Sequence, residues 1–92
     1  MSNTRFSLGQ LLITARALAR LDELGVSPAP FFARHQAGDW GDIPPDDAAA
    51  NEEALAEGGR LLSVYPAAEG CRVWIITEAD RRLTTMLLPE EY

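Results

Sequence analysis

The chain has 92 residues, of which 47% are hydrophobic, and its formal net charge is −6. This length and composition exclude a largely disordered chain, so we expect residues 1–92 to form a single domain. All eight positive charges are arginines, and the acidic balance disfavours direct binding of DNA or RNA because it repels phosphates.

The N-terminal third contains signals for one strand and one helix. Residues 1–5 are polar and at a chain end, so we expect them to be disordered. Residues 6–13 mix apolar and small side chains and predict a short strand. Thr14 is a suitable helix N-cap, apolar residues follow at helical spacing, and Gly25 supplies a stop.

Two further helices are predicted in the middle of the chain. The first begins at Ser27-Pro28 and reaches Gln36, and we expect only one of Phe31 and Phe32 to enter the core. The second begins at Pro44-Pro45 and ends before Gly58-Gly59. Its apolar stripe is thin, and Asn51 lies on that stripe, either capping a nearby loop carbonyl or marking the edge of the buried stripe.

The last third is typical of a β-meander. Residues 60–65, 71–77 and 82–88 form three predicted strands with short connections, which favours antiparallel pairing. The sequence therefore predicts an α+β fold with an N-terminal strand, three short helices and a three-stranded antiparallel meander. We expect the helices to pack on one face of that sheet.

The strand over residues 71–77 is apolar on both faces. Alternation places Trp74 and Ile76 opposite Val73 and Ile75. One face packs on the helices, and the other is either covered by further chain or exposed to a partner. We expect the Trp74 face to be an interface, first with a second copy of the chain and otherwise with a partner protein.

The single histidine and the last hairpin contain the only residues that suggest catalysis. His35 has the pKa of a general acid–base, and with Arg81, Thr84 and Thr85 it makes an alternative nuclease site. The competing interpretation is that His35 is a helix-dipole partner or a surface residue and that the arginines form local ion pairs. One histidine and one cysteine cannot form a zinc site within one chain, so we expect no metal and no cofactor.

The cysteine count and hydropathy bear on the compartment. Cys71 is the only cysteine and we expect it to be a small buried hydrophobe. With no internal disulfide, no signal-peptide pattern and no apolar run of bilayer length, the sequence predicts a cytoplasmic protein without a membrane partner.

An acidic block and a loop tryptophan are the candidate partner-binding residues. Between residues 39 and 57 there are seven carboxylates and no positive charge. They form either a solvated helix face or a decoy for a basic, nucleic-acid-binding partner. Trp40 either covers the core or anchors an interface. The acidic residues are Asp39, Asp42, Asp46, Asp47, Glu52, Glu53 and Glu57.

Four segments resemble a family of small uncharacterised proteins found on bacterial plasmids, integrative elements and phages. They are residues 35–42, residues 74–92, residues 60–65 and Asn51, and the resemblance extends over nearly the whole chain. Some members are labelled plasmid-related or type I restriction-modification subunits, a label that looks inherited from neighbouring genes. Arg82 departs from the serine expected in relatives. The resemblance implies mobile-element biology and supplies no catalytic residue.

Three functions follow as alternatives. The first is a non-enzymatic protein-interaction module of a mobile genetic element, with counter-defence against a restriction or CRISPR component as its most specific form. The second is a small toxin-type ribonuclease, because the predicted order of helices and strands is similar to the order in such enzymes. The third is a structural homodimer.

Overall fold

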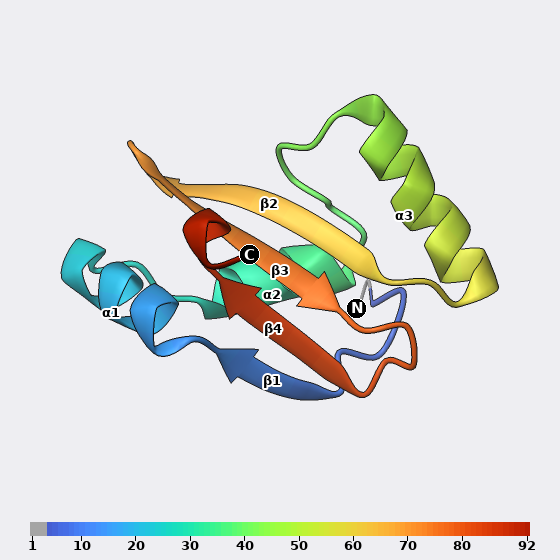
Figure 1. Cartoon of the computed structure of the whole chain (residues 1–92), viewed down its shortest axis with the longest axis horizontal. Helices are drawn as coiled ribbons and strands as arrows, with labels where there is room; N and C mark the ends of the chain where they lie inside the picture. The colour runs from blue at the N-terminus through green and yellow to red at the C-terminus, as the bar shows by residue number, and fades with distance from the viewer. Residues whose placement is uncertain (1–3) are drawn as a thin grey trace.

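The computed structural model describes residues 4–92 and has an α+β fold, as predicted (Figure 1). The predicted order of strand, three helices and three strands is confirmed. Its elements are β1 (Gln10–Ile13), α1 (Ala15–Leu24), α2 (Ala29–Gln36), α3 (Pro45–Glu57), β2 (Leu61–Ala68), β3 (Cys71–Thr77), β4 (Leu83–Leu87) and the 3-10 helix η1 (Pro89–Glu91).

The sheet has four strands in the order β1-β4-β3-β2. Strands β2, β3 and β4 form the predicted antiparallel meander. The expectation of a three-stranded sheet is wrong in one respect, because β1 pairs with β4 in parallel and makes the sheet mixed. The first strand of the chain is therefore bound to the last one.

The predicted ends of α1 are confirmed, but the strand before it is shorter than predicted. Thr14 Oγ1 accepts a hydrogen bond from Ala17 N at 3.1 Å, and Gly25 ends the helix with a φ of 67°. Strand β1 begins only at Gln10, because the preceding segment turns toward α2, where Gln36 Nε2 donates to Phe6 O.

Only part of the prediction of disorder over residues 1–5 can be compared with the structure. Residues 1–3 lie outside the described part of the chain. Arg5 is held in place, since its backbone N donates to Gln36 O and its guanidinium forms two hydrogen bonds to the carboxylate of Glu52, at 2.8 and 2.9 Å. Arg5 is thus part of the folded domain, contrary to expectation.

Helix α2 buries both of its phenylalanines, so the prediction that only one enters the core is wrong. Phe31 stacks on Tyr65 with ring centroids 5.6 Å apart, and Phe32 is only 6% exposed. His35 is buried on the same helix. This short helix therefore buries a broad face between α1 and the sheet.

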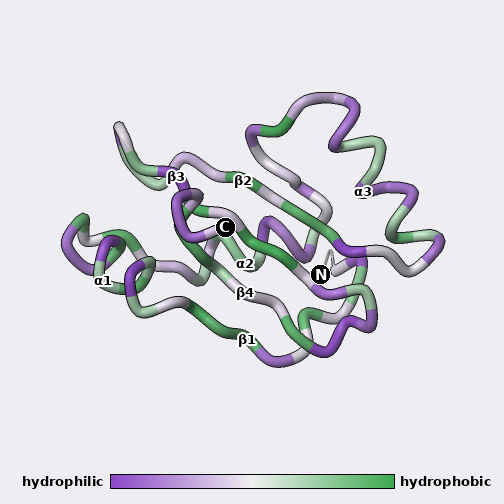
Figure 2. The backbone as a smooth tube through the Cα atoms, viewed as in Figure 1, coloured by the Kyte–Doolittle hydropathy of each residue, from purple (hydrophilic) through white to green (hydrophobic). Residues whose placement is uncertain are grey.

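Two helices, not three, make the core with the sheet. Helices α1 and α2 cover one face, whereas α3 lies along the outer edge of β2 (Figure 1). Figure 2 shows hydrophobic residues concentrated in the strands and hydrophilic ones along α3. The buried core residues are Ala17, Leu21, Phe31, Phe32, Tyr65, Val73, Ile75, Met86 and Leu88.

Asn51 explains how a helix with so thin an apolar stripe is attached. Its amide Nδ2 donates to Leu62 O at 2.7 Å, and its Oδ1 accepts from Leu62 N at 3.1 Å. The side chain therefore takes the place of a neighbouring strand at the free edge of β2. Asn51 does cap a carbonyl, but that carbonyl belongs to strand β2 and not to a loop as expected, and Asn51 satisfies the N–H as well.

The loop before α3 protects the next position of the same edge. Val64 N donates to Trp40 O at 3.1 Å, and Val64 O accepts from Asp42 N at 2.7 Å. A Cβ on Gly41 would collide with Val64 O, so only glycine permits this close approach. Pro66, the next residue whose backbone faces outward, has no N–H to pair, and the β2 edge is closed to another strand.

We predict that Asn51→Ala destabilises the domain by about 2–3 kcal/mol, because it leaves the buried N–H and C=O of Leu62 without partners. Urea denaturation measures the free energy of unfolding. The matched control is Glu53→Ala, an exposed residue of the same helix with no tertiary contact to lose. An effect of Asn51→Ala no larger than that of the control would contradict this role.

Candidate functional sites

A chain of polar side chains crosses the apolar core. His35 is fully buried, and its Nδ1 lies 2.5 Å from Ser63 Oγ while its Nε2 lies 2.9 Å from Thr77 Oγ1. Thr77 Oγ1 is 2.7 Å from Thr84 Oγ1, which in turn donates to Leu8 O at 2.7 Å. The chain joins α2, three strands and the N-terminal segment.

The direction of every hydrogen bond in this chain follows from its last acceptor. A backbone carbonyl such as Leu8 O only accepts, so the single proton of Thr84 points toward it. Thr84 Oγ1 then accepts from Thr77, and Thr77 Oγ1 accepts from His35 Nε2–H. His35 Nε2 therefore carries a proton. Because the imidazole is neutral, as its lowered pKa shows, Nδ1 carries none and Ser63 donates to it.

Burial, together with the positive charge of Arg81, lowers the pKa of His35 to about 4. The imidazole therefore stays neutral at physiological pH. No buried side-chain polar atom among residues 4–92 lacks a hydrogen-bond partner, so the chain is complete as it stands. Its geometry supports a structural role for His35.

The four residues of the alternative nuclease site do not form one exposed site. His35 and Thr84 meet in the core through Thr77, and both are fully buried. Thr85 faces the other side of the sheet, because neighbouring strand residues point in opposite directions. No substrate phosphate reaches His35 in this structure.

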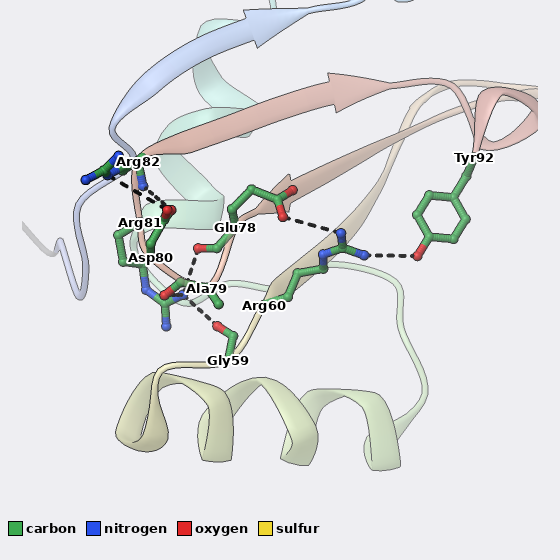
Figure 3. A network of polar contacts seen from close by, with 8 residues as sticks. All are labelled: Gly59, Arg60, Glu78, Ala79, Asp80, Arg81, Arg82 and Tyr92. Atoms are coloured by element: carbon green, nitrogen blue, oxygen red, sulfur yellow. Dashed lines mark hydrogen bonds and ion pairs between the residues drawn. The ribbon is translucent and has the colours of Figure 1, made fainter.

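Arg81 is bound by backbone carbonyls rather than by a carboxylate. Its Nη1 donates to the carbonyls of Gly59 at 2.6 Å, Glu78 at 3.1 Å and Ala79 at 3.3 Å (Figure 3). Its Nη2 donates to Ala54 O at 3.1 Å. It therefore joins the end of α3 to the β3–β4 turn. The expectation of a local ion pair is wrong for Arg81.

Arg82, its neighbour, behaves differently. Its Nε lies 3.9 Å from Asp80 Oδ2, and its side chain is 87% exposed. An exposed pair at this distance contributes little to stability. The expected local ion pair is therefore present at Arg82, but the interaction is weak.

The acidic block is partly neutralised by arginines from elsewhere in the chain. Asp39 pairs with Arg34 at 2.6 Å, and Glu52 pairs with Arg5. The hydrogen bonds from these arginines lower the pKa of both carboxyl groups. Asp42 pairs with Arg72 at 2.8 Å. The acidic residues for which the described chain shows no ion pair are Asp46, Asp47, Glu53 and Glu57, all exposed on α3.

Trp40 covers the core and is not an exposed anchor. Only 6% of it is accessible. Its indole Nε1 donates to Glu52 Oε2 at 3.0 Å, and its ring packs against Phe6 and His35 with centroids 6.2 and 5.7 Å away. A partner cannot reach Trp40 without local opening, so its assignment as a partner-binding residue is wrong for this structure.

The Trp74 face has more cover within the chain than the sequence suggested. Ile76 is 7% exposed, so the expectation of an open patch is wrong there. Trp74 stays half-buried, and the Tyr92 ring packs on it with centroids 5.1 Å apart. Arg60 holds the Tyr92 side chain in this position. Its guanidinium donates to Tyr92 Oη at 3.5 Å and to Glu78 Oε1 at 3.3 Å (Figure 3).

A groove of about 360 Å³ opens beside Trp74. Its apolar lining includes Trp74, Val64 and Ile43, so it lies between the sheet and the loop that leads into α3. Asp42 and Asp47 line the same groove. The structure thus brings together a half-buried aromatic residue and two carboxylates that the sequence analysis treated as separate candidates.

The other expectations concern metals, cysteine and membranes. Within residues 4–92, no three potential ligands are grouped to hold a metal ion. Cys71 is a free, buried thiol, as predicted. No helix in this part of the chain has the length and apolar character needed to span a bilayer.

Fold and groove together define a small α+β domain with a partly apolar groove that Asp42, Asp47 and Arg72 also line. No protein-family model, curated protein or solved structure matches the chain. The functional argument therefore rests on this groove and on the charges around it.

We predict that the domain loses stability as the pH falls from 6.5 toward 4. In that window His35 gains a proton in the unfolded chain but not in the folded one, whose His35 pKa is about 4. The difference corresponds to about 3 kcal/mol. Urea denaturation between pH 7.5 and 5 should show about 2 kcal/mol of this loss, before most of the carboxyl groups titrate.

The control is His35→Gln, whose amide keeps one donor and one acceptor but does not titrate. This variant is less stable than the parent chain at neutral pH, and its stability should not change between pH 6.5 and 5. A parent chain with constant stability over the same interval would contradict a neutral buried imidazole.

We predict that Arg81→Ala costs about 2–4 kcal/mol and Arg81→Gly about 1 kcal/mol less. Both variants lose the hydrogen bonds to carbonyls. Arg81 has a φ of 62°, which strains any residue with a Cβ but not glycine. Chemical denaturation of the two variants tests the order, and equal losses would show that the backbone at this position is unstrained.

Proposed function

We propose that this domain is a non-enzymatic protein-interaction module whose groove binds a basic segment of a partner protein. The observation that carries the proposal is the position of Asp47, for which the described chain shows no ion pair, in the lining of the groove that contains Trp74. Asp42 and Arg72 also line the groove and pair with each other. A segment with an apolar side chain beside arginine or lysine has the matching chemistry, because the apolar side chain would pack on Trp74 and the cation would face Asp47.

The distribution of charge supports a basic partner. Six of the eight arginines are in ion pairs: those at positions 5, 20, 34, 60, 72 and 82. Arg81 is occupied by carbonyls. The exposed carboxylates of α3 next to the groove therefore keep their negative field, which attracts a positively charged partner and speeds its association.

The apolar part of the groove supports a protein partner rather than a free cation. Tryptophan is enriched among the residues that dominate binding energy at protein interfaces. Trp74 is half-buried in the free domain, and its ring is already held by Tyr92. A partner would complete its burial without a large ordering cost.

The most specific form of this proposal is counter-defence by a mobile genetic element. The resemblance to proteins of plasmids, integrative elements and phages supports that setting. Restriction and CRISPR components bind nucleic acid through basic surfaces, and an acidic groove complements such a surface. On this proposal the partner is the nucleic-acid-binding surface of a defence protein, and the domain blocks it by occupying it.

We predict that the paired variant Asp46→Asn with Asp47→Asn loses binding to its basic partner. Proteins captured from a host lysate by the parent domain are identified by mass spectrometry, and the association rate of each purified candidate is then measured. The parent rate should fall as salt rises, because exposed charges are screened beyond about 8 Å at physiological ionic strength. The paired variant should associate about tenfold more slowly.

The matched control is Asp22→Asn with Glu23→Gln on α1. It changes the net charge by the same amount at exposed positions away from the groove. Trp74→Ala should raise the dissociation rate. Equal association rates for the groove pair and the control pair, or a captured partner without a basic surface, would contradict the proposal.

A further inference from the structure

Strand β1 is an open edge of the sheet. It pairs with β4 on one side, and among residues 4–92 no strand lies beyond it. Gln10 N donates to Arg82 O and Thr14 N donates to Met86 O, so the even-numbered residues direct their backbone groups toward β4. By alternation, Leu11 and Ile13 direct their N–H and C=O groups outward.

The two edges of the sheet are treated differently. On β2, the outward backbone positions are closed by Asn51, by the loop containing Gly41 and by Pro66. Residues 6–14 contain no charged residue and no proline, and these are the usual devices that keep an edge strand from pairing. Figure 2 shows β1 as a hydrophobic segment at the margin of the molecule.

The side chains of this edge are unusually exposed as well. Leu11 is 47% and Leu12 is 41% exposed, and they lie on opposite faces of the sheet. Large aliphatic side chains next to unpaired backbone groups are the features of a strand that pairs with another strand.

We propose that β1 pairs with β1 of a second copy of this chain, antiparallel, with Leu12 on the twofold axis. Leu11 of one copy exchanges both backbone hydrogen bonds with Ile13 of the other, and the symmetric pair follows. The two Leu12 residues then form the non-hydrogen-bonded pair, whose Cα atoms are about 4.5 Å apart and whose side chains touch. The two sheets become one continuous sheet.

A second copy fits this edge better than an unrelated strand for two reasons. The outward groups of Leu11 and Ile13 are placed symmetrically about Leu12, so the edge is complementary to itself in an antiparallel pair. The segment is also uncharged in a chain whose net charge is −6, so two copies meet where their mutual repulsion is weakest. This places the homodimer on β1 rather than on the Trp74 face, and it leaves the groove free for a partner.

Light scattering after size exclusion tests the dimer, which should have twice the 10.1 kDa mass of one chain. Leu12→Lys puts two like charges against each other on the axis, and it should raise the dissociation constant about tenfold or more. Leu12→Glu should do the same. An equimolar mixture of the two variants should recover the dimer, because opposite charges then face each other.

The matched control is Leu18→Lys, at a leucine that is 50% exposed on α1, and it should dimerise like the parent. Amide exchange gives a second measure that needs no variant: the Leu11 and Ile13 amides should become protected as the concentration rises, while the Leu12 amide is protected throughout. A parent chain that is monomeric at high concentration, or a dimer that Trp74→Ala dissociates and Leu12→Lys does not, would overturn the proposal.

Discussion

The fold depends on one chain of hydrogen bonds inside the core, which runs from Ser63 through the imidazole of His35 and the hydroxyls of Thr77 and Thr84 to the carbonyl of Leu8. An apolar core tolerates small shifts, whereas each hydroxyl here has one proton and one place for it. A slip of β4 by one residue would turn both Thr84 and the fully buried Met86 to the other face of the sheet. The hydrogen-bond chain and the burial of Met86 together therefore favour one register of β3 against β4.

Helix α3 is attached by polar side chains that replace backbone partners. Asn51 occupies the free edge of β2, and Arg81 binds the carbonyls at the end of the helix. Glu52 completes the attachment by receiving hydrogen bonds from Arg5 and Trp40. These contacts lie on the inner side of α3. The residues on its outer side are therefore not needed to attach the helix, and they include the exposed carboxylates beside the groove.

Local signals were sufficient for the meander and for α1, since alternation and the Thr14 cap depend only on neighbouring residues. Contacts distant in sequence were not predictable in the same way. The parallel pairing of β1 requires knowledge of β4, and His35 looked accessible because nothing nearby shows that hydroxyls from two strands surround it. The contacts of Trp40 and Glu52 were not predictable for a similar reason. Their partners are each other and Arg5, and the spacing of charges along the chain does not reveal an ion pair across 47 positions.

The parallel pairing of β1 with β4 also constrains how the domain is made. During synthesis on the ribosome, the N-terminal strand emerges first and its only neighbour within the described chain emerges last. Until β4 leaves the exit tunnel, the apolar segment around Leu11 and Leu12 has no complete sheet to join. Folding of this domain is therefore completed only after β4 has emerged. A message truncated before β4 yields a chain with an exposed aggregation-prone strand rather than a smaller working domain.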